Sequence, residues 1–136
     1  MSAEEELELV YGLIAECYEY ELDGRIVLKN FTSDELVAIY NGTGPEWMSE
    51  KARKVLDTLS KDLLPAVLIH DVEFHIGGSR TNFYFVNERL RHNCIVLAKS
   101  KYGWWRPRRY RLLAQANLFA DLCQACGKLA YNGDKK

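Results

Sequence analysis

The sequence predicts a single all-α domain that spans residues 1–136 and contains five to six helices and at most one short strand. Three observations predict this fold. Apolar residues recur every three to four positions in several long windows, the periodicity of a helix with one buried face. Residues that favour helix ends stand at the borders of those windows. The composition, with 48% apolar and 27% charged residues, is that of an ordinary globular domain.

The first third of the chain predicts two helices with a short connection between them. Apolar side chains return at helical spacing over residues 3–20. Residues 25–31 are short, β-branched and alternating enough for a strand or an extended arm. Thr32 and Glu35 form a capping box, in which a hydroxyl and a carboxylate satisfy free amides at a helix start. A second helix is therefore expected to run to about Tyr40.

The middle of the chain predicts the central helix of the fold. The loop 41–45 holds two glycines and a proline, which cannot continue a helix, and a helix over about 49–60 follows it. Pro65 suits the first turn of the next helix, which reaches the glycines at 77 and 78. This segment is apolar almost all round, so it should lie at the centre of the domain.

Two further helices are expected after these glycines. The first of them covers about 79–98, with a core stripe made of Phe83, Val86, Leu90, Cys94 and Leu97. The last helix covers about 108–130, with Leu112, Ala116, Phe119, Cys123 and Cys126 on one face. A basic and aromatic connection, residues 99–107, joins the two.

Charge and cysteine usage indicate the compartment and the kind of partner. The acidic N-terminus lacks the basic start and apolar core of a signal peptide, so a cytoplasmic location is expected. The four cysteines, all on apolar helix stripes, are expected to be buried thiols with no disulfides. Residues 1–50 hold twelve acidic and two basic side chains, whereas 51–136 hold seven acidic and sixteen basic ones. The basic part favours an anionic partner.

His70 and Asp71 lie next to each other inside the apolar central helix. Burying a carboxylate costs several kcal/mol unless it is paired or bound to a metal. A purely structural interpretation pairs Asp71 with an arginine such as Arg80 or Arg89 and buries His70 in the core. The alternative is a functional site, in which the two side chains have different tasks because adjacent helical residues point about 100° apart.

The order of three motifs resembles phospholipase A2-like proteins, and in particular a small branch found in bacterial phages and prophages. The motifs are Asn-Gly-Thr-Gly-Pro-Glu-Trp at 41–47, Pro-Ala-Val-Leu-Ile-His-Asp-Val-Glu-Phe at 65–74 and Thr-Asn-Phe-Tyr-Phe-Val-Asn-Glu-Arg-Leu at 81–90. The resemblance covers about residues 30–131. It implies an all-α fold in which two antiparallel helices face each other across the active site.

The resemblance also implies a role for each motif residue. His70 would be the general base that activates water, and Asn82 stands where the family has the aspartate that orients this histidine. Asp71 would bind calcium together with backbone carbonyls of Gly42, Gly44 and Glu46.

Four departures from the family pattern weaken the implied site. Asn82 cannot stabilise an imidazolium by charge, and Phe74 replaces a tyrosine. The loop has no glycine after Glu46, so calcium is expected to bind weakly. Thr43 and Val67 replace two cysteines that form a disulfide in the family, which agrees with a reducing compartment.

The connection between the last two helices is a second candidate site. Residues 99–111 hold six basic side chains, four aromatic ones and no acid. This pattern fits a membrane or nucleic-acid surface formed by Trp104, Trp105, Arg106, Arg108, Arg109 and Arg111. The competing interpretation packs the tryptophans inward and pairs the arginines with the acidic N-terminal half.

Two functions are therefore expected from different classes. The first is a phospholipase A2-like protein of the phage or prophage type, either a weak calcium-dependent lipid hydrolase or one that has lost activity. Its partner would be phospholipid or an anionic membrane surface. The second is a non-enzymatic phage accessory or structural protein that binds protein or nucleic acid through residues 99–111.

Overall fold

The computed structural model describes residues 2–41 and 58–126, and every element in these two ranges is helical. In chain order they are α1 (Ala3–Glu19), η1 (Arg25–Asn30), α2 (Ser33–Asn41), η2 (Lys61–Leu63), α4 (Leu64–Ile76), α5 (Arg80–Lys101) and α6 (Pro107–Cys126). The η elements are short 3-10 helices. The predicted all-α class is thus confirmed. The predicted loop 41–45, most of the helix predicted over 49–60 and residues 127–130 of the last helix lie outside the described residues.

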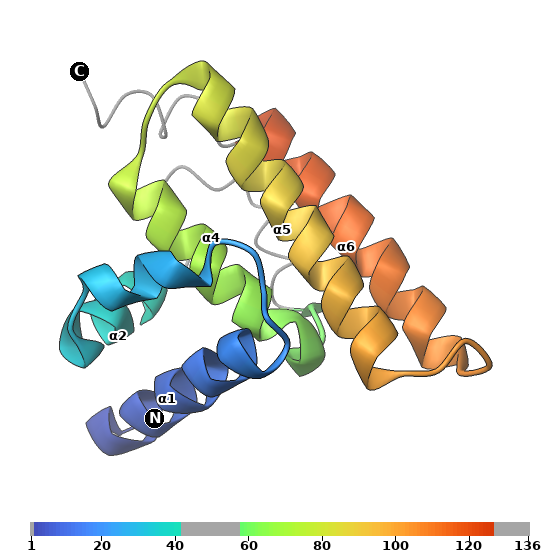
Figure 1. Cartoon of the computed structure of the whole chain (residues 1–136), viewed down its shortest axis with the longest axis horizontal. Helices are drawn as coiled ribbons and strands as arrows, with labels where there is room; N and C mark the ends of the chain where they lie inside the picture. The colour runs from blue at the N-terminus through green and yellow to red at the C-terminus, as the bar shows by residue number, and fades with distance from the viewer. Residues whose placement is uncertain (1, 42–57, 127–136) are drawn as a thin grey trace.

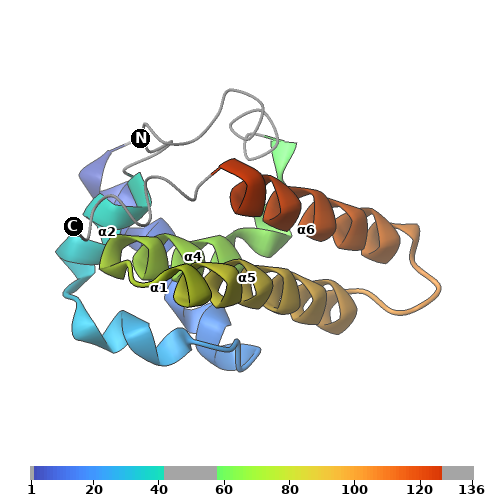
Figure 2. The ribbon, with the colours of Figure 1, turned by 90° about the horizontal axis from the view of Figure 1, so that it is seen from above.

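Helix α4 lies at the centre, as predicted, because apolar side chains surround it almost completely. It contacts α1, α2, α5 and both 3-10 helices. Figure 1 shows α4 antiparallel to α5, with α1 and α2 on its other side. Figure 2 shows α5 and α6 as a long antiparallel hairpin that extends beyond the rest of the molecule. The predicted core stripe of α5 is buried throughout, at Phe83, Val86, Leu90, Cys94 and Leu97.

The predicted caps and breakers set the helix ends. Thr32 and Glu35 exchange both hydrogen bonds of the capping box, at 3.2 and 2.8 Å. Pro65 stands in the first turn of α4, and Gly77 ends that helix with a positive φ of 74°. The Ser79 hydroxyl accepts from the Asn82 amide at the start of α5. Local chemistry alone therefore defines these boundaries.

The strand or extended arm predicted for residues 25–31 is wrong, because this segment is the 3-10 helix η1. Gly24 adopts the left-handed conformation, with φ 82°, and its carbonyl accepts from the Val27 amide at 3.1 Å. The segment satisfies its backbone locally, and the part of the chain that the structure describes offers no strand to pair with it. Leu28 is buried while Ile26 is 69% exposed, so one apolar side chain anchors the turn.

Candidate functional site

The histidine of the central helix forms a buried hydrogen bond with the next helix. His70 is 2% exposed, and its Nε2 lies 2.9 Å from Oδ1 of Asn87 on α5. Asn87 is fully buried, and its Nδ2 donates to Oε1 of Gln124 on α6 at 2.9 Å. A chain of two hydrogen bonds between three side chains, those of His70, Asn87 and Gln124, thus links α4, α5 and α6.

The direction of these bonds defines the state of the imidazole. Because the Asn87 amide nitrogen donates to Gln124, its oxygen faces His70 and can only accept. Nε2 of His70 therefore carries the proton, and Nδ1 keeps its lone pair. Burial lowers the pKa of His70 to about 4, against a smaller raising effect of the Asn87 hydrogen bond. The imidazole is accordingly neutral near pH 7, with an unprotonated nitrogen at Nδ1.

The prediction that Asn82 orients His70 is wrong. The hydrogen-bond partner of His70 is Asn87, whereas Asn82 is exposed. The two asparagines are five positions apart on α5, so at about 100° per residue their side chains point roughly 140° apart. The core stripe could have identified the right one. Asn87 follows the buried Phe83 by four positions and precedes the buried Leu90 by three, which places it on the buried face.

Asp71 lies on α4 beside His70 but makes no ion pair within the residues that the structure describes. Part of the residue is exposed, yet burial of its carboxyl raises the pKa of that group well above the usual range. Tyr40 of α2 lies near this carboxyl, and the pKa of Tyr40 is raised to about 12 by burial and by the negative charge of Asp71. Tyr40 is a neighbour that the sequence did not indicate.

The expected calcium ligands are only partly described. Gly42, Gly44 and Glu46 lie outside the described residues, so Asp71 is the only expected ligand whose position is known. Within residues 2–41 and 58–126, no three histidine, cysteine or acidic side chains gather closely enough to hold a metal ion. A calcium site here would therefore need backbone carbonyls in addition to Asp71.

The arginine offered as a structural partner of Asp71 binds elsewhere. Arg89 bridges two acids, donating from Nε to Asp23 at 2.9 Å and from Nη1 to the buried Glu73. Burial raises the pKa of Glu73 to about 7, although Arg89 acts in the opposite direction. This bridge ties the turn after α1 to α4 and α5. The side chain of Arg80 lies outside the described residues.

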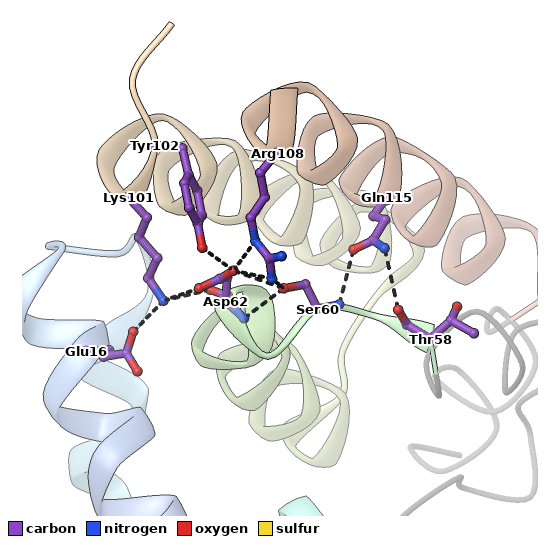
Figure 3. Close-up of polar contacts among 8 residues, drawn as sticks. All are labelled: Glu16, Thr58, Ser60, Asp62, Lys101, Tyr102, Arg108 and Gln115. Carbon is purple, nitrogen blue, oxygen red and sulfur yellow. Dashed lines mark hydrogen bonds and ion pairs between the residues drawn. The ribbon is translucent and has the colours of Figure 1, made fainter. Parts of the chain in front are cut away.

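A second polar cluster joins the start of α4 to the hairpin end, with Asp62 of η2 at its centre (Figure 3). Lys101 lies 2.6 Å from Glu16 and 3.7 Å from Asp62, while the Tyr102 hydroxyl donates to Asp62 at 2.9 Å. Arg108 donates to the same carboxylate from Nε and Nη2, at 3.2 and 3.1 Å. Arg108, expected on a free basic surface, is thus largely engaged within the domain.

Replacement of Asp62 by asparagine is expected to lower the free energy of unfolding by about 1–2 kcal/mol, because several donors lose a charged acceptor that is 21% exposed. Urea unfolding of this variant measures the loss. Asp34→Asn, an exposed change in the first turn of α2, is the control. Equal unfolding midpoints for Asp62→Asn and the wild type would contradict a stabilising cluster.

The remaining predicted surface residues lie at the end of the α5–α6 hairpin. Trp104 and Trp105 are 72% and 67% exposed, so the inward packing considered for them is wrong. Arg106 and Arg111 are exposed, and Arg109 is partly buried. The structure therefore brings the aromatic and basic residues of this segment to one end of the molecule.

The cysteines behave as buried thiols where the structure describes them. Cys17, Cys94 and Cys123 are fully buried. The Cys17 thiol donates to the Pro65 carbonyl at 3.3 Å, and burial raises the pKa of Cys17 and of Cys94 to about 12. Such thiols are poor nucleophiles near pH 7. The Cys126 side chain lies outside the described residues.

Two further findings bear on the class of protein. Among the described helices, none combines the length and apolar character needed to cross a bilayer. Comparison with known proteins found no match to this chain among protein-family models, curated proteins or solved structures.

Proposed function

We propose that the α4–α5 helix pair is the active centre of a phospholipase A2-type ester hydrolase related to the phage and prophage branch. The observation that carries this proposal is the hydrogen bond of 2.9 Å between His70 Nε2 and Asn87 Oδ1. It holds the ring with the proton on Nε2, so that the lone pair of Nδ1 is available to accept a proton. A positioned neutral imidazole is the group that removes a proton from water near pH 7.

In the proposed reaction His70 Nδ1 takes a proton from water, and the resulting hydroxide adds to the carbonyl carbon of the lipid ester. The same proton then passes to the leaving alcohol oxygen as the ester bond breaks. Asn87 keeps the imidazole in the required tautomer throughout. Because its amide is neutral, it stabilises the imidazolium less than a carboxylate would. Hydrolysis by this centre should therefore be slow.

Asp71 supports a weak calcium site in this proposal, since it is an oxygen donor with no ion-pair partner in the described part of the chain. Calcium would polarise the ester carbonyl. The carbonyls of Gly42, Gly44 and Glu46 are the further ligands proposed from the sequence. The high pKa of Asp71 means that the metal must compete with a proton, which lowers the affinity.

The direct test measures fatty-acid release from phospholipid, in calcium and in a calcium chelator. Wild type should hydrolyse slowly in calcium, and His70→Gln should fall to background. His92→Gln, an exposed histidine of α5, is the matched control and should match wild type. Background rates in wild type, or equal rates in all three proteins, would refute the catalytic role of His70.

Calcium is expected to bind with a dissociation constant in the millimolar range, since one carboxylate and a few carbonyls form a ligand set of low charge (weak sites reach roughly 10⁻⁴–10⁻³ M). Titration calorimetry of wild type and Asp71→Asn measures it. Heat that saturates for wild type and disappears in Asp71→Asn supports the site. Identical featureless traces for both proteins would leave Asp71 as a structural residue.

A second function, a non-catalytic phage accessory protein that binds through residues 99–111, is favoured by a difference in exposure. His70 is 2% exposed and so has little contact with solvent, whereas Trp104 is 72% exposed and can contact a partner directly. Calcium-independent binding through this segment, with no hydrolysis at all, is the result expected for that function.

A further inference from the structure

The two tryptophans of the hairpin end are exposed together. The turn between α5 and α6 carries Trp104 and Trp105, with their ring centroids 6.1 Å apart and an interplanar angle of 86°. Figure 2 shows this turn at the tip of the hairpin, beyond the helices that pack around α4. Large apolar side chains gathered on an exposed surface indicate a binding site, because folding alone gains nothing from their exposure.

The turn holds these rings in a defined place. The Tyr110 hydroxyl donates to the Trp104 carbonyl at 2.7 Å, and the Arg106 amide donates to the Gly103 carbonyl at 3.0 Å. Gly103 leaves room for the Trp105 ring beside the turn, since a Cβ atom at position 103 would lie 2.5 Å from this ring and would displace it. The exposed rings are therefore part of a structured turn.

The charges beside the turn oppose the stability of the helix that carries them. Helix α6 begins at Pro107, and its first turn has arginines at 108 and 109 and no acid. The amino end of a helix is already positive, so these cations raise the free energy of the folded chain. Asp62 offsets Arg108, but Arg106 and Arg111 make no ion pair in the described residues. Nε of Arg109 is buried and has no hydrogen-bond partner there. An anionic partner would compensate this excess.

A pocket of about 360 Å³ adds to the positive character of the same end. It lies between η2 and α6, and the charged residues of its lining are Lys61, Arg108 and Arg111 together with Asp62, which pairs with Arg108. Neither Lys61 nor Arg111 has a carboxylate partner within the ranges that the structure describes. The pocket is large enough for a phosphate group, the anion that arginine side chains bind best.

We infer that the hairpin end docks onto an anionic phospholipid bilayer, with Trp104 and Trp105 in the interfacial layer and the exposed Arg106 and Arg111 on lipid phosphates. Indole rings favour the membrane interface because one part is apolar and the ring nitrogen needs a polar partner. Arginine clusters add attraction to anionic lipid. Single-stranded nucleic acid fits less well, since two indoles at right angles on a protruding tip offer no platform for stacked bases.

The docking end is remote from the proposed catalytic pair. Asn87 and Lys101 are fourteen positions apart on α5, which is about 21 Å at 1.5 Å per residue. The inference goes beyond the proposed hydrolase and holds with or without ester hydrolysis. It is therefore tested by binding alone.

Co-sedimentation with vesicles tests the inference, using phosphatidylcholine alone and phosphatidylcholine mixed with phosphatidylserine. Wild type should bind the mixed vesicles more tightly and lose binding in high salt. Arg106→Gln with Arg111→Gln should weaken binding roughly 30-fold, at about fivefold for each arginine near the surface. Arg25→Gln with Lys29→Gln removes the same charge from η1 and should leave most of the binding.

The aromatic pair has its own matched control. Trp104→Ser with Trp105→Ser should abolish most vesicle binding. Tyr84→Ser with Phe85→Ser removes another exposed edge-to-face pair, on the first turns of α5, and should bind like wild type. Equal loss in both double variants, equal binding to both vesicle types, or binding to a single-stranded oligonucleotide but not to vesicles would each overturn the inference.

Discussion

Wild-type protein should lose about 3 kcal/mol of stability relative to His70→Gln as the pH falls from 6.5 to 4. Burial lowers the pKa of His70 from 6.5 to about 4, so the unfolded chain binds a proton in this range while the folded protein does not. A group with a lowered folded pKa of this kind contributes stability above pH 6.5 and loses it as the pH falls. Glutamine keeps a donor for Asn87 and does not titrate.

Urea unfolding at a series of pH values measures this difference. The comparison with His70→Gln matters because Glu73 acts in the opposite direction. Its pKa is raised from 4.5 to about 7 by burial, so its contribution is present below pH 4.5 and is lost as the pH rises through 7. Because both proteins contain Glu73, its contribution to the pH dependence of stability cancels in the difference between them. Parallel stability curves would show that His70 is accessible to protons in the folded state.

Asn87→Asp should raise ester hydrolysis by about 10²-fold, which is the lower range of what a well-oriented general base contributes. A carboxylate at this position would accept the same Nε2–H bond and stabilise the imidazolium that forms at His70. The pKa of His70 should rise with it. Fatty-acid release and nuclear magnetic resonance titration of the His70 ring measure the two effects.

Asn82→Asp is the control for this prediction, because Asn82 is exposed on the same helix and was the position favoured by the sequence. It should leave both hydrolysis and the pKa of His70 unchanged. If Asn87→Asp raises the pKa of His70 but shows no hydrolysis, the result would support the hydrogen bond between the two residues and contradict the catalytic proposal. A rise in activity in Asn82→Asp would contradict the geometry itself.

Much of the fold could be predicted from the sequence because its determinants are local. The capping box of Thr32 and Glu35, Pro65 in a first turn and Gly77 at a helix end act within a few residues of themselves. The core stripes follow from the 3.6-residue period, which needs no knowledge of what packs against them. The all-α class and the central position of α4 depend on nothing more.

Local information was not sufficient for residues 25–31. Their alternating apolar pattern is compatible with a strand and with a tight helical turn, and the choice depends on whether another strand is available to pair. The left-handed Gly24 and the burial of Leu28 against the core decide for the 3-10 helix. Backbone groups that find no neighbouring strand must be satisfied within the segment.

The partners of the polar side chains were decided by the tertiary structure. The sequence placed a histidine on a buried helix beside an asparagine-bearing one, but it could not show that Asn87 takes the hydrogen bond. Nor could it show that Arg89 binds Glu73 and Arg108 binds Asp62. Each of these contacts depends on how two helices are rotated and displaced against each other. Side-chain packing across the whole interface sets that register, and a rotation equivalent to one residue would present a different side chain.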